Sequence, residues 1–366
     1  MTIGVVGGGQ LGRMLALAGY PLGLDFLFLD RSAAAPAGQV APLVSAELSD
    51  RARLADLGSR CDVVTFDWEN VPVDAMRAIG RGCPVRPSLT ALAAAQDRAS
   101  EKRLFERLDI PTTRWRSVAS RRELERALAE VGLPGVLKTR RLGYDGKGQA
   151  AVRTREEAEE AWLRLGAAPL LYEEHVPFEQ EVSIIGARGR RGETAIYPLC
   201  VNTHARGVLR VTRAPGGPAR LQALAARYLS RALEHFAYRG VLTIEFFVRA
   251  GRLIANEMAP RVHNSGHWTI EGAETSQFEN HVRAVVGLPL GSTRARGHAA
   301  MVNLIGRLPP RAALLARPGL HLHEYGKEPR PGRKLGHCTL LAPTAQARDA
   351  QLRRLLAELA PDIRIP

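Results

Sequence analysis

The residues best suited to chemistry form a lysine-bearing strand followed by a glycine-rich loop. Val136-Leu137-Lys138 is a short apolar run that ends on one cation, and the stretch from Gly143 to Gln149 contains three glycines. Glycine-dense backbone bends freely, so its N–H groups can close over phosphate oxygens while Lys138 supplies a point charge. Lys147 either adds a phosphate contact or is a solvated loop cation, and a surface hairpin is the alternative for the whole stretch. The loop lacks a closing Gly-Lys-Ser/Thr and is therefore not a P-loop.

Lysine is rare in this chain, which makes each lysine informative. The 51 basic residues comprise 46 Arg and five Lys. Where either cation would serve, the chain uses Arg, so a lysine indicates a place that needs a compact and flexible charge. Four of the five lie in stretches that are of interest on other grounds. The five are Lys102, Lys138, Lys147, Lys327 and Lys334.

Two carboxylates interrupt neighbouring apolar strands. Glu245 lies inside the run 243–248, and Glu257 ends the run 253–257. The turn Ala250-Gly251-Arg252 predicts a hairpin that brings the two acids together. Paired carboxylates repel each other, and Mg²⁺ relieves that repulsion while it bridges triphosphate oxygens. Salt bridges to two arginines are the alternative.

Two polar stretches accompany these strands. Glu173-Glu174-His175-Val176 ends a strand, where backbone groups can meet an adenine edge and the carboxylates its amino group; Glu181 can accept from ribose hydroxyls. By itself, each acid is typical of a solvated surface. Directly after Glu257, Arg261 and His263 can hold a small carboxylate or carboxyphosphate-like anion.

The two ends of the chain carry a glycine turn and a basic cluster. The turn Gly7–Gly12 fits G-x-G-x-x-G between a strand and a helix, and Asp30 closes the next strand, which predicts dinucleotide binding. A phosphate monoester would use the same glycines and helix N-terminus equally well. The late cluster comprises 325–327 and 333–337, and a solvated turn is its alternative.

The elements that must position these residues divide the chain into three parts. Alternating strands and helices predict a Rossmann-like parallel α/β sheet in residues 1–95. The middle part, 96–295, is richer in strands and is expected to be α+β, with a lid at about 110–175. A small C-terminal domain, 296–366, ends on an amphipathic helix. The expected strands are 3–7, 24–29, 63–66, 136–138, 170–174, 181–185, 241–248 and 253–257, and the expected helices are 11–18, 89–108, 121–131, 155–165 and 345–359.

Composition excludes several classes of protein. The formal charge is +14, but the arginines are scattered and no basic arm is present, so we expect anionic small-molecule sites rather than nucleic acid. No apolar run reaches the roughly 18 residues that a membrane helix needs, and the N-terminus does not look like a secretory signal. The four cysteines are isolated, which argues against a zinc site or a disulfide framework and favours the cytoplasm.

Together these stretches resemble the ATP-grasp superfamily and, within it, the 5-(carboxyamino)imidazole ribonucleotide synthetase family. One departure is Asp67-Trp68, where the family more usually has Glu-Phe before Glu69. The similar stretches are GGGQLGRM (7–14), WENVP (68–72), RPS (86–88), QDRASEK (96–102), KTRRLGYDGKGQ (138–149), NEMAPRVHNSGHWTIEGA (256–273) and YGKEPRPGRKLGH (325–337).

The resemblance implies a reaction and a set of site residues. ATP and bicarbonate would carboxylate 5-aminoimidazole ribonucleotide through carboxyphosphate in purine biosynthesis, releasing ADP and phosphate, with Mg²⁺ (Mn²⁺ as a substitute) held by Glu245 and Glu257. Asp145, Arg261, His263 and Lys327 would act near the carboxylation centre. The implied ATP-binding residues are Arg98, Lys138, Gly143, Tyr144, Asp145, Gly146, Lys147, Gly148, Gln149, Glu173, Glu174, His175, Val176, Glu181, His204, Asn256 and Glu257. The implied substrate-binding residues are Gly9, Gln10, Leu11, Glu69, Arg261, Asn264, Lys327, Arg333 and Lys334.

Three other readings remain open from the sequence. A different ATP-grasp ligase would share the lysine strand and the glutamate hairpin, although Lys327 to His337 argues against it. An NAD-dependent oxidoreductase would rest on the glycine turn and Asp30 and would leave Lys138 unexplained. A nucleic-acid-binding protein would rest on charge alone. The family expectation for assembly is a homodimer without membrane or nucleic-acid partners.

Overall fold

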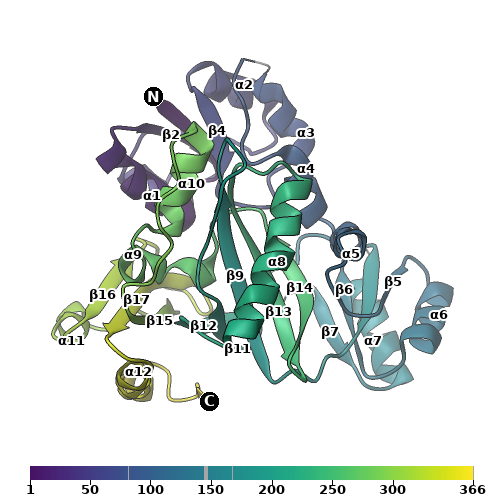
Figure 1. Cartoon of the computed structure of the whole chain (residues 1–366). Helices are drawn as coiled ribbons and strands as arrows, with labels where there is room; N and C mark the ends of the chain where they lie inside the picture. The colour runs from purple at the N-terminus through teal and green to yellow at the C-terminus, as the bar shows by residue number, and fades with distance from the viewer. Residues whose placement is uncertain (81, 144–146, 167, 366) are drawn as a thin grey trace.

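The first part of the chain folds into a parallel four-stranded sheet in the order β3-β2-β1-β4 (Figure 1). The computed structural model describes residues 1–80, 82–143, 147–166 and 168–365. The buried runs of β1 and β4 are apolar on both faces, as strands covered on both sides are. The strands are β1 (Thr2–Val6), β2 (Asp25–Asp30), β3 (Leu43–Ser45) and β4 (Val63–Phe66), and the helices here are α1 (Gln10–Gly19), α2 (Arg51–Ser59) and α3 (Val73–Met76).

A second, antiparallel sheet with the order β5-β8-β6-β7 forms a separate layer at the right of Figure 1. It comprises β5 (Trp115–Val118), β6 (Gly135–Thr139), β7 (Gln149–Val152) and β8 (Leu170–Glu174), with α6 (Arg121–Val131) and α7 (Arg155–Leu165) packed against it. Ser120 and Thr154 cap these helices by accepting the backbone N–H of Glu123 and Glu157. We call this layer the lid sheet.

The central sheet joins strands from the middle and the end of the chain in the order β14-β13-β9-β11-β12-β15-β17-β16, with β10 beside β9. The last three strands of that order come from the C-terminal segment, which therefore shares a sheet with the middle segment. The strands are β9 (Gln180–Arg188), β10 (Thr194–Ile196), β11 (Cys200–Ala205), β12 (Val208–Ala214), β13 (Gly240–Arg249), β14 (Arg252–Ala259), β15 (His298–Ile305), β16 (Leu320–Glu324) and β17 (Lys334–Ala342).

Helices cover the central sheet and join it to the first sheet. One apolar core lies between the first sheet and the central sheet, where α10 packs on both α1 and β13; a second lies under α8. Leu352 and Leu355 of α12 pack against β15 and β17. The remaining helices are α4 (Leu89–Ala95), α5 (Arg98–Arg107), α8 (Ala219–His235), α9 (Thr269–Gly272), α10 (Gln277–Val286), α11 (Arg311–Leu315) and α12 (Ala345–Leu359), and short 3-10 turns span 20–22, 36–39, 77–79 and 264–266.

The predicted continuous helix over 89–108 is wrong, because the chain breaks it after Ala95. Asp97 has extended backbone, and its carboxylate accepts the N–H groups of Ala99 and Ser100 as the N-cap of α5. The same carboxylate pairs with Arg140 at 2.8 Å. An aspartate that competes for backbone donors favours a helix start over a helix interior. The break turns α5 so that Arg98 lies against Glu257 and Lys102 against Glu173.

Candidate active site

A buried carboxylate between two lysines joins α5 to the lid sheet. Lys138 Nζ on β6 lies 2.5 Å from Glu173 Oε1 on β8, and Lys102 Nζ lies 2.9 Å from Glu173 Oε2. Thr113 Oγ1 also donates to Oε2, at 2.7 Å. Burial opposes ionisation of Glu173, but Lys102 and Lys138 outweigh it and hold its pKa well below the usual range. Burial lowers the pKa of Lys138 despite Glu173.

The three residues that follow Glu173 have surroundings that differ from one another. Glu174 accepts the N–H of Arg114 at 3.0 Å and pairs with its guanidinium at 2.9 Å. His175 is exposed and Val176 is buried. The carboxylates of Glu173 and Glu174 both form ion pairs, and the contact of this segment with adenine stays a prediction.

The predicted glutamate hairpin is confirmed, and its register brings the acids together. Glu245 on β13 is paired directly with Glu257 on β14, and the next pair, Phe246 and Ala255, skips Asn256. Such a β-bulge re-aims side chains and is frequent beside active sites. Asn256 Oδ1 is buried without a hydrogen-bond partner among the described residues. The bulge therefore leaves Asn256 outside the regular pairing, next in sequence to Glu257.

Cations and imidazoles surround this acid pair. Arg98 lies 3.3 Å from Glu257, His263 Nε2 lies 3.2 Å from Glu245, and His204 Nδ1 lies 2.9 Å from Glu181. Burial and the neighbouring carboxylates raise the pKa of Glu245 to about 7, with His204 opposing them. Although burial opposes it, the hydrogen bond to Glu181 and the charges nearby raise the pKa of His204. Among the described residues, Glu257 pairs with an arginine, as the salt-bridge alternative expects, whereas Glu245 pairs with His263.

Gly143, at the beginning of the glycine loop, lies beside the start of α5. Arg98 Nη2 lies 3.5 Å from the carbonyl oxygen of Gly143, and Gln149 pairs with Lys138 in the lid sheet. Gly148 has a positive φ of 71°, and a Cβ there would lie 2.5 Å from Thr139 Oγ1, so the position requires glycine. Lys147 lies in the described part of the loop and interacts with a neighbour. The predicted site residues Tyr144, Asp145 and Gly146 lie outside the described residues.

The polar loop after β14 meets the first domain. Arg261 Nη2 lies 2.6 Å from Glu69 Oε2, and His263 Nδ1 lies 2.8 Å from Ser265 Oγ. Burial and the charge of Arg261 hold the pKa of His263 well below its usual range. Both polar atoms of the Asn264 side chain are buried without a partner in the described chain. An amide in this state is ready to bind a ligand.

The two ends of the chain meet beside this loop. Lys327 Nζ donates to Gln10 Oε1 at 2.5 Å, across 317 positions of sequence. Burial and the charge of Arg333 lower the pKa of Lys327 to about 8. Arg333 donates to the carbonyl of Glu328 at 3.1 Å, and Lys334 begins β17. Gly9 is the N-cap of α1 and supplies no side-chain cap, and in the first turn the N–H of Gly12 is accepted by Asp67 Oδ2 at 3.0 Å.

A small cavity is lined by several of these groups. It measures about 50 Å³, which is room for a few water molecules or a small oxyanion. Its walls include Glu101, which the sequence does not mark as a site residue beyond its place within the QDRASEK stretch, 96–102. Lys102, the next residue of that stretch, lies outside the lining and pairs with Glu173. The lining residues include Glu69, Asn70, Arg98, Glu101, Gly143, Glu257, Arg261 and His263.

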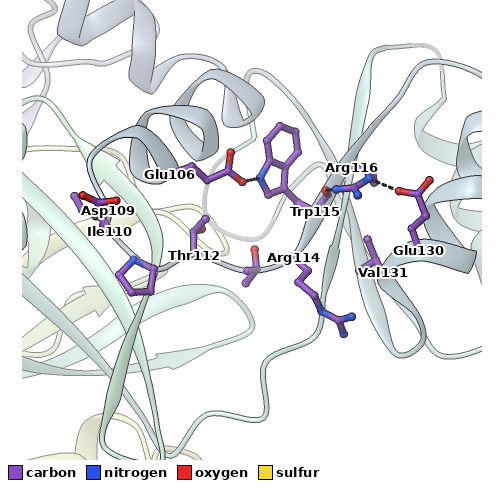
Figure 2. A pocket seen from close by; sticks show the side chains of 11 residues that line it. Glu106, Asp109, Ile110, Thr112, Arg114, Trp115, Arg116, Glu130 and Val131 are labelled. Carbon is purple, nitrogen blue, oxygen red and sulfur yellow. Dashed lines mark hydrogen bonds and ion pairs between the residues drawn. The ribbon is translucent and has the colours of Figure 1, made fainter.

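A larger cleft of about 550 Å³ lies beside the lid sheet, and two of its lining residues, Thr113 and Arg114, contact Glu173 and Glu174. Figure 2 shows Trp115 turned toward Glu106, and Arg116 paired with Glu130, along its walls. Its described lining contains no predicted site residue. The larger of the two cavities is therefore not the one that the predicted site residues line.

The site and the fold define an ATP-grasp protein. The family model of the ATP-grasp domain matches residues 103–278, the ribonucleotide synthetase preATP-grasp domain matches 1–96, and the phosphoribosylaminoimidazole carboxylase C-terminal domain matches 299–351. The chain belongs to the N5-carboxyaminoimidazole ribonucleotide synthase family. The resemblance stated from the motifs, the α/β fold class with an ATP-grasp core, and the class of enzyme are thereby confirmed.

Relatives and solved structures match over nearly the whole chain. The N5-carboxyaminoimidazole ribonucleotide synthase of Pseudomonas aeruginosa is 50% identical over 359 residues, covering 97% of this chain and 99% of that protein. The Brucella melitensis enzyme of the same name is 45% identical, with 93% and 96% covered. The Thermus thermophilus synthetase structure has 53% identity and a TM-score of 0.94, covering 100% of this chain and 99% of that one. An Aspergillus clavatus synthase solved with ADP and 5-aminoimidazole ribonucleotide has 29% identity and a TM-score of 0.91, with 99% of both chains covered.

Proposed function

We propose that this chain uses ATP and bicarbonate to carboxylate the amine of 5-aminoimidazole ribonucleotide, releasing ADP and phosphate, as a step of purine biosynthesis. The observation that carries the proposal is one small cavity lined by Arg98, by Glu257 of the glutamate hairpin and by the Arg261 loop. Lys138 of the lid sheet lies outside its lining, but although burial raises the pKa of Glu257, the charges of Arg98 and of nearby Lys138 lower it. Similarity to curated synthases at up to 50% identity supports the same reaction. A relative bound to ADP and the aminoimidazole nucleotide supports the two ligands.

ATP would lie between the lid sheet and β13–β14. Lys138, Arg98 and the glycine loop would bind its phosphates. Lys138 pairs with Glu173, and Arg98 contacts Gly143 at the wall of the cavity. The backbone of 173–176 would meet the adenine, with Glu181 and His204 at the ribose side. Phosphorylation of bicarbonate gives carboxyphosphate, which water destroys, so the loop would act as the lid that excludes water.

The nucleotide substrate would lie between the first domain and the Arg261 loop. Gln10 and Leu11 offer backbone N–H groups at the start of α1, and Lys327 lies against Gln10, so its phosphate would bind there with Arg333 and Lys334. Glu69 would contact the ribose, and Asn264 would use its unpaired amide. Arg261 and His263 would hold the carboxylate being transferred, and neutral His263 can accept a proton from the attacking amine.

The residues of the glutamate hairpin fit a magnesium ion. Glu245 and Glu257 are adjacent, and Asn256 adds an unpartnered oxygen, the donor type that this ion prefers. In the described chain no three such side chains form a preformed cage, which agrees with an ion held by two carboxylates and ligand phosphates. When bound, it would neutralise charge on the phosphates. Mn²⁺ is expected to substitute.

We also retain the division into 1–95, 96–295 with a lid at about 110–175, and 296–366. The structure contains four free cysteines, which suits a cytoplasmic enzyme. Within the described chain no helix is long and apolar enough to cross a membrane. A homodimer is the expected assembly, with ATP, bicarbonate and the aminoimidazole nucleotide as small-molecule partners and no nucleic acid.

The deciding assay measures ADP release with ATP, bicarbonate and 5-aminoimidazole ribonucleotide, omitting each in turn. We expect release to require all three, and ¹³C-bicarbonate to label a carbamate product. ADP release that is indifferent to the aminoimidazole nucleotide but responds to another amine would instead identify a different ATP-grasp ligase.

A further inference from the structure

The first sheet has the form of a nucleotide-binding sheet, but a carboxylate occupies its crevice. The strands are all parallel, but their order changes side at β1: β2 and β3 follow on one side of β1, and the chain then crosses to place β4 on the other side. In open parallel sheets, ligands bind beyond the carboxyl ends of the strands at such a change of side. Asp67 directly follows β4 and is held to β1 by its N–H bond to the carbonyl of Val6, at 3.1 Å. Its side chain therefore lies at the place where this fold binds phosphate.

The glycines of the turn fit this carboxylate. Asp67 is 6% exposed, and its Oδ2 accepts the N–H of Gly12 at 3.0 Å. A Cβ on Gly7 would lie 1.9 Å from Asp67 Oδ1, and one on Gly9 or Gly12 would lie 3.0 or 3.1 Å from Oδ2. A side chain at Gly7 would collide with the carboxylate, and one at Gly9 or Gly12 would crowd it, with Phe28 at 2.9 Å adding to the crowding at Gly12, so the G-x-G-x-x-G pattern is explained without a dinucleotide.

A second carboxylate takes another donor of the same turn. Asp30 Oδ2 accepts the N–H of Gly8 at 2.7 Å, and its Oδ1 accepts that of Ser32 at 2.9 Å. Within the described chain, the backbone donors left without a partner at the start of α1 are those of Gln10 and Leu11, and Lys327 contacts the Gln10 side chain. The N–H groups of Gly8 and Gly12 thus face carboxylates, and only those of Gln10 and Leu11 are presented to an anion.

We propose that Asp67, assisted by Asp30, is a specificity-determining residue that restricts this site to a single phosphate group and excludes ligands carrying a diphosphate, dinucleotides included. The identity of the single phosphate as that of a ribonucleotide rests on the proposed function. Burial raises the pKa of Asp67 to about 6, against the effect of the Gly12 N–H, so the carboxylate is charged at neutral pH. The charged groups that face it are Asp30, Arg261 and Lys327.

The test compares ribose 5-phosphate with ADP-ribose by titration calorimetry, with the ATP site filled by a non-hydrolysable ATP analogue and Mg²⁺. The wild type should bind ribose 5-phosphate at least about 10-fold more tightly, because the second phosphate adds a charge beside the carboxylate. Asp67→Asn should reduce that ratio by about 5-fold or more. Asp62→Asn is the matched control, since exposed Asp62 also accepts a backbone N–H, that of Thr2 at 2.7 Å, but at the other end of the sheet; it should leave the ratio unchanged.

A folded Asp67→Asn protein with the wild-type ratio would overturn the proposal, as would a wild type without the preference. If Asp67→Asn does not fold, Asp30→Asn decides, because Asp30 is only partly buried and its loss should shift the ratio in the same direction. Binding is measured without turnover. A chain that selects ribose 5-phosphate but releases no ADP would therefore refute the proposed function alone.

Discussion

Glu101 makes the protein less stable at high pH, and Glu101→Gln should remove that effect. The carboxyl is 2% exposed, and its Oε1 accepts the N–H of Met258 at 2.6 Å. Burial first, and the charge of Glu257 second, raise its pKa from 4.5 to about 8. A carboxyl with a higher pKa in the folded chain binds more protons there, so stability is greatest at low pH and falls as pH rises from 4.5 towards 8.

The magnitude follows from that interval. At about 1.4 kcal/mol per pH unit, the full effect above pH 8 is at most about 5 kcal/mol. Glutamine keeps the shape and can still accept the Met258 N–H, so the variant loses only the charge. Its advantage in free energy of unfolding should grow by about 2–3 kcal/mol between about pH 6 and about pH 8.5.

Urea unfolding at the two pH values, with EDTA and no nucleotide, measures this difference. Glu123→Gln is the control, because Glu123 also lies in the first turn of a helix and accepts a backbone N–H, from Ala119 at 2.7 Å, but is exposed. The free energy of unfolding of Glu123→Gln, relative to the wild type, should change little between the two pH values. A Glu101→Gln advantage that is the same at both pH values, or a variant less stable than the wild type at about pH 8.5, would refute the reasoning.

Other substitutions test the remaining charges of the site. Lys138→Ala should lower the rate of ADP release by about 100-fold or more in a folded protein, and Lys138→Arg should restore it only partly; Arg114→Ala, on an exposed ion pair, should leave it near normal. Near-normal turnover of Lys138→Ala would mean that the phosphate site lies elsewhere. Glu173→Gln should lower the free energy of unfolding by about 3–5 kcal/mol in denaturant titrations because it leaves two buried lysines unpaired, whereas Lys102→Met should have a smaller effect. Mn²⁺ affinity in the presence of ADP should fall as pH drops below about 7, where Glu245 becomes protonated, and Glu245→Gln should bind weakly without that pH dependence.

The sequence predicted those elements and contacts that depend on local pattern. The boundaries of α6, α7, β8 and α12 follow from their caps and apolar periodicity, and the short turn 250–252 set the hairpin that pairs Glu245 with Glu257. The bulge at Asn256 and the break at Asp97 were not predicted, because each depends on hydrogen bonds that compete with the regular pattern.

Residues that act through distant contacts were harder to find. Glu101 reads as a solvated helix residue, and only the fold shows that Met258 covers it. Asp67 drew notice only as a departure from the family pattern, because the three glycines that it contacts lie more than fifty positions away. The contact between Lys327 and Gln10 came from resemblance, since no local rule joins residues 317 positions apart.

The arrangement of charge in the site also corrects the simple picture of a basic pocket. The net charge of +14 suggests a surplus of cations, yet the cations of the site are largely paired with acids: Lys138 with Glu173, Arg98 with Glu257 and Arg261 with Glu69. A triphosphate that approaches Lys138 and Arg98 must compete with those carboxylates, and the acids it displaces then need a new cation. A divalent ion at the hairpin supplies one. If the proposed site is right, we therefore expect nucleotide binding and metal binding to be linked through Arg98, which contacts both Glu257 and Gly143.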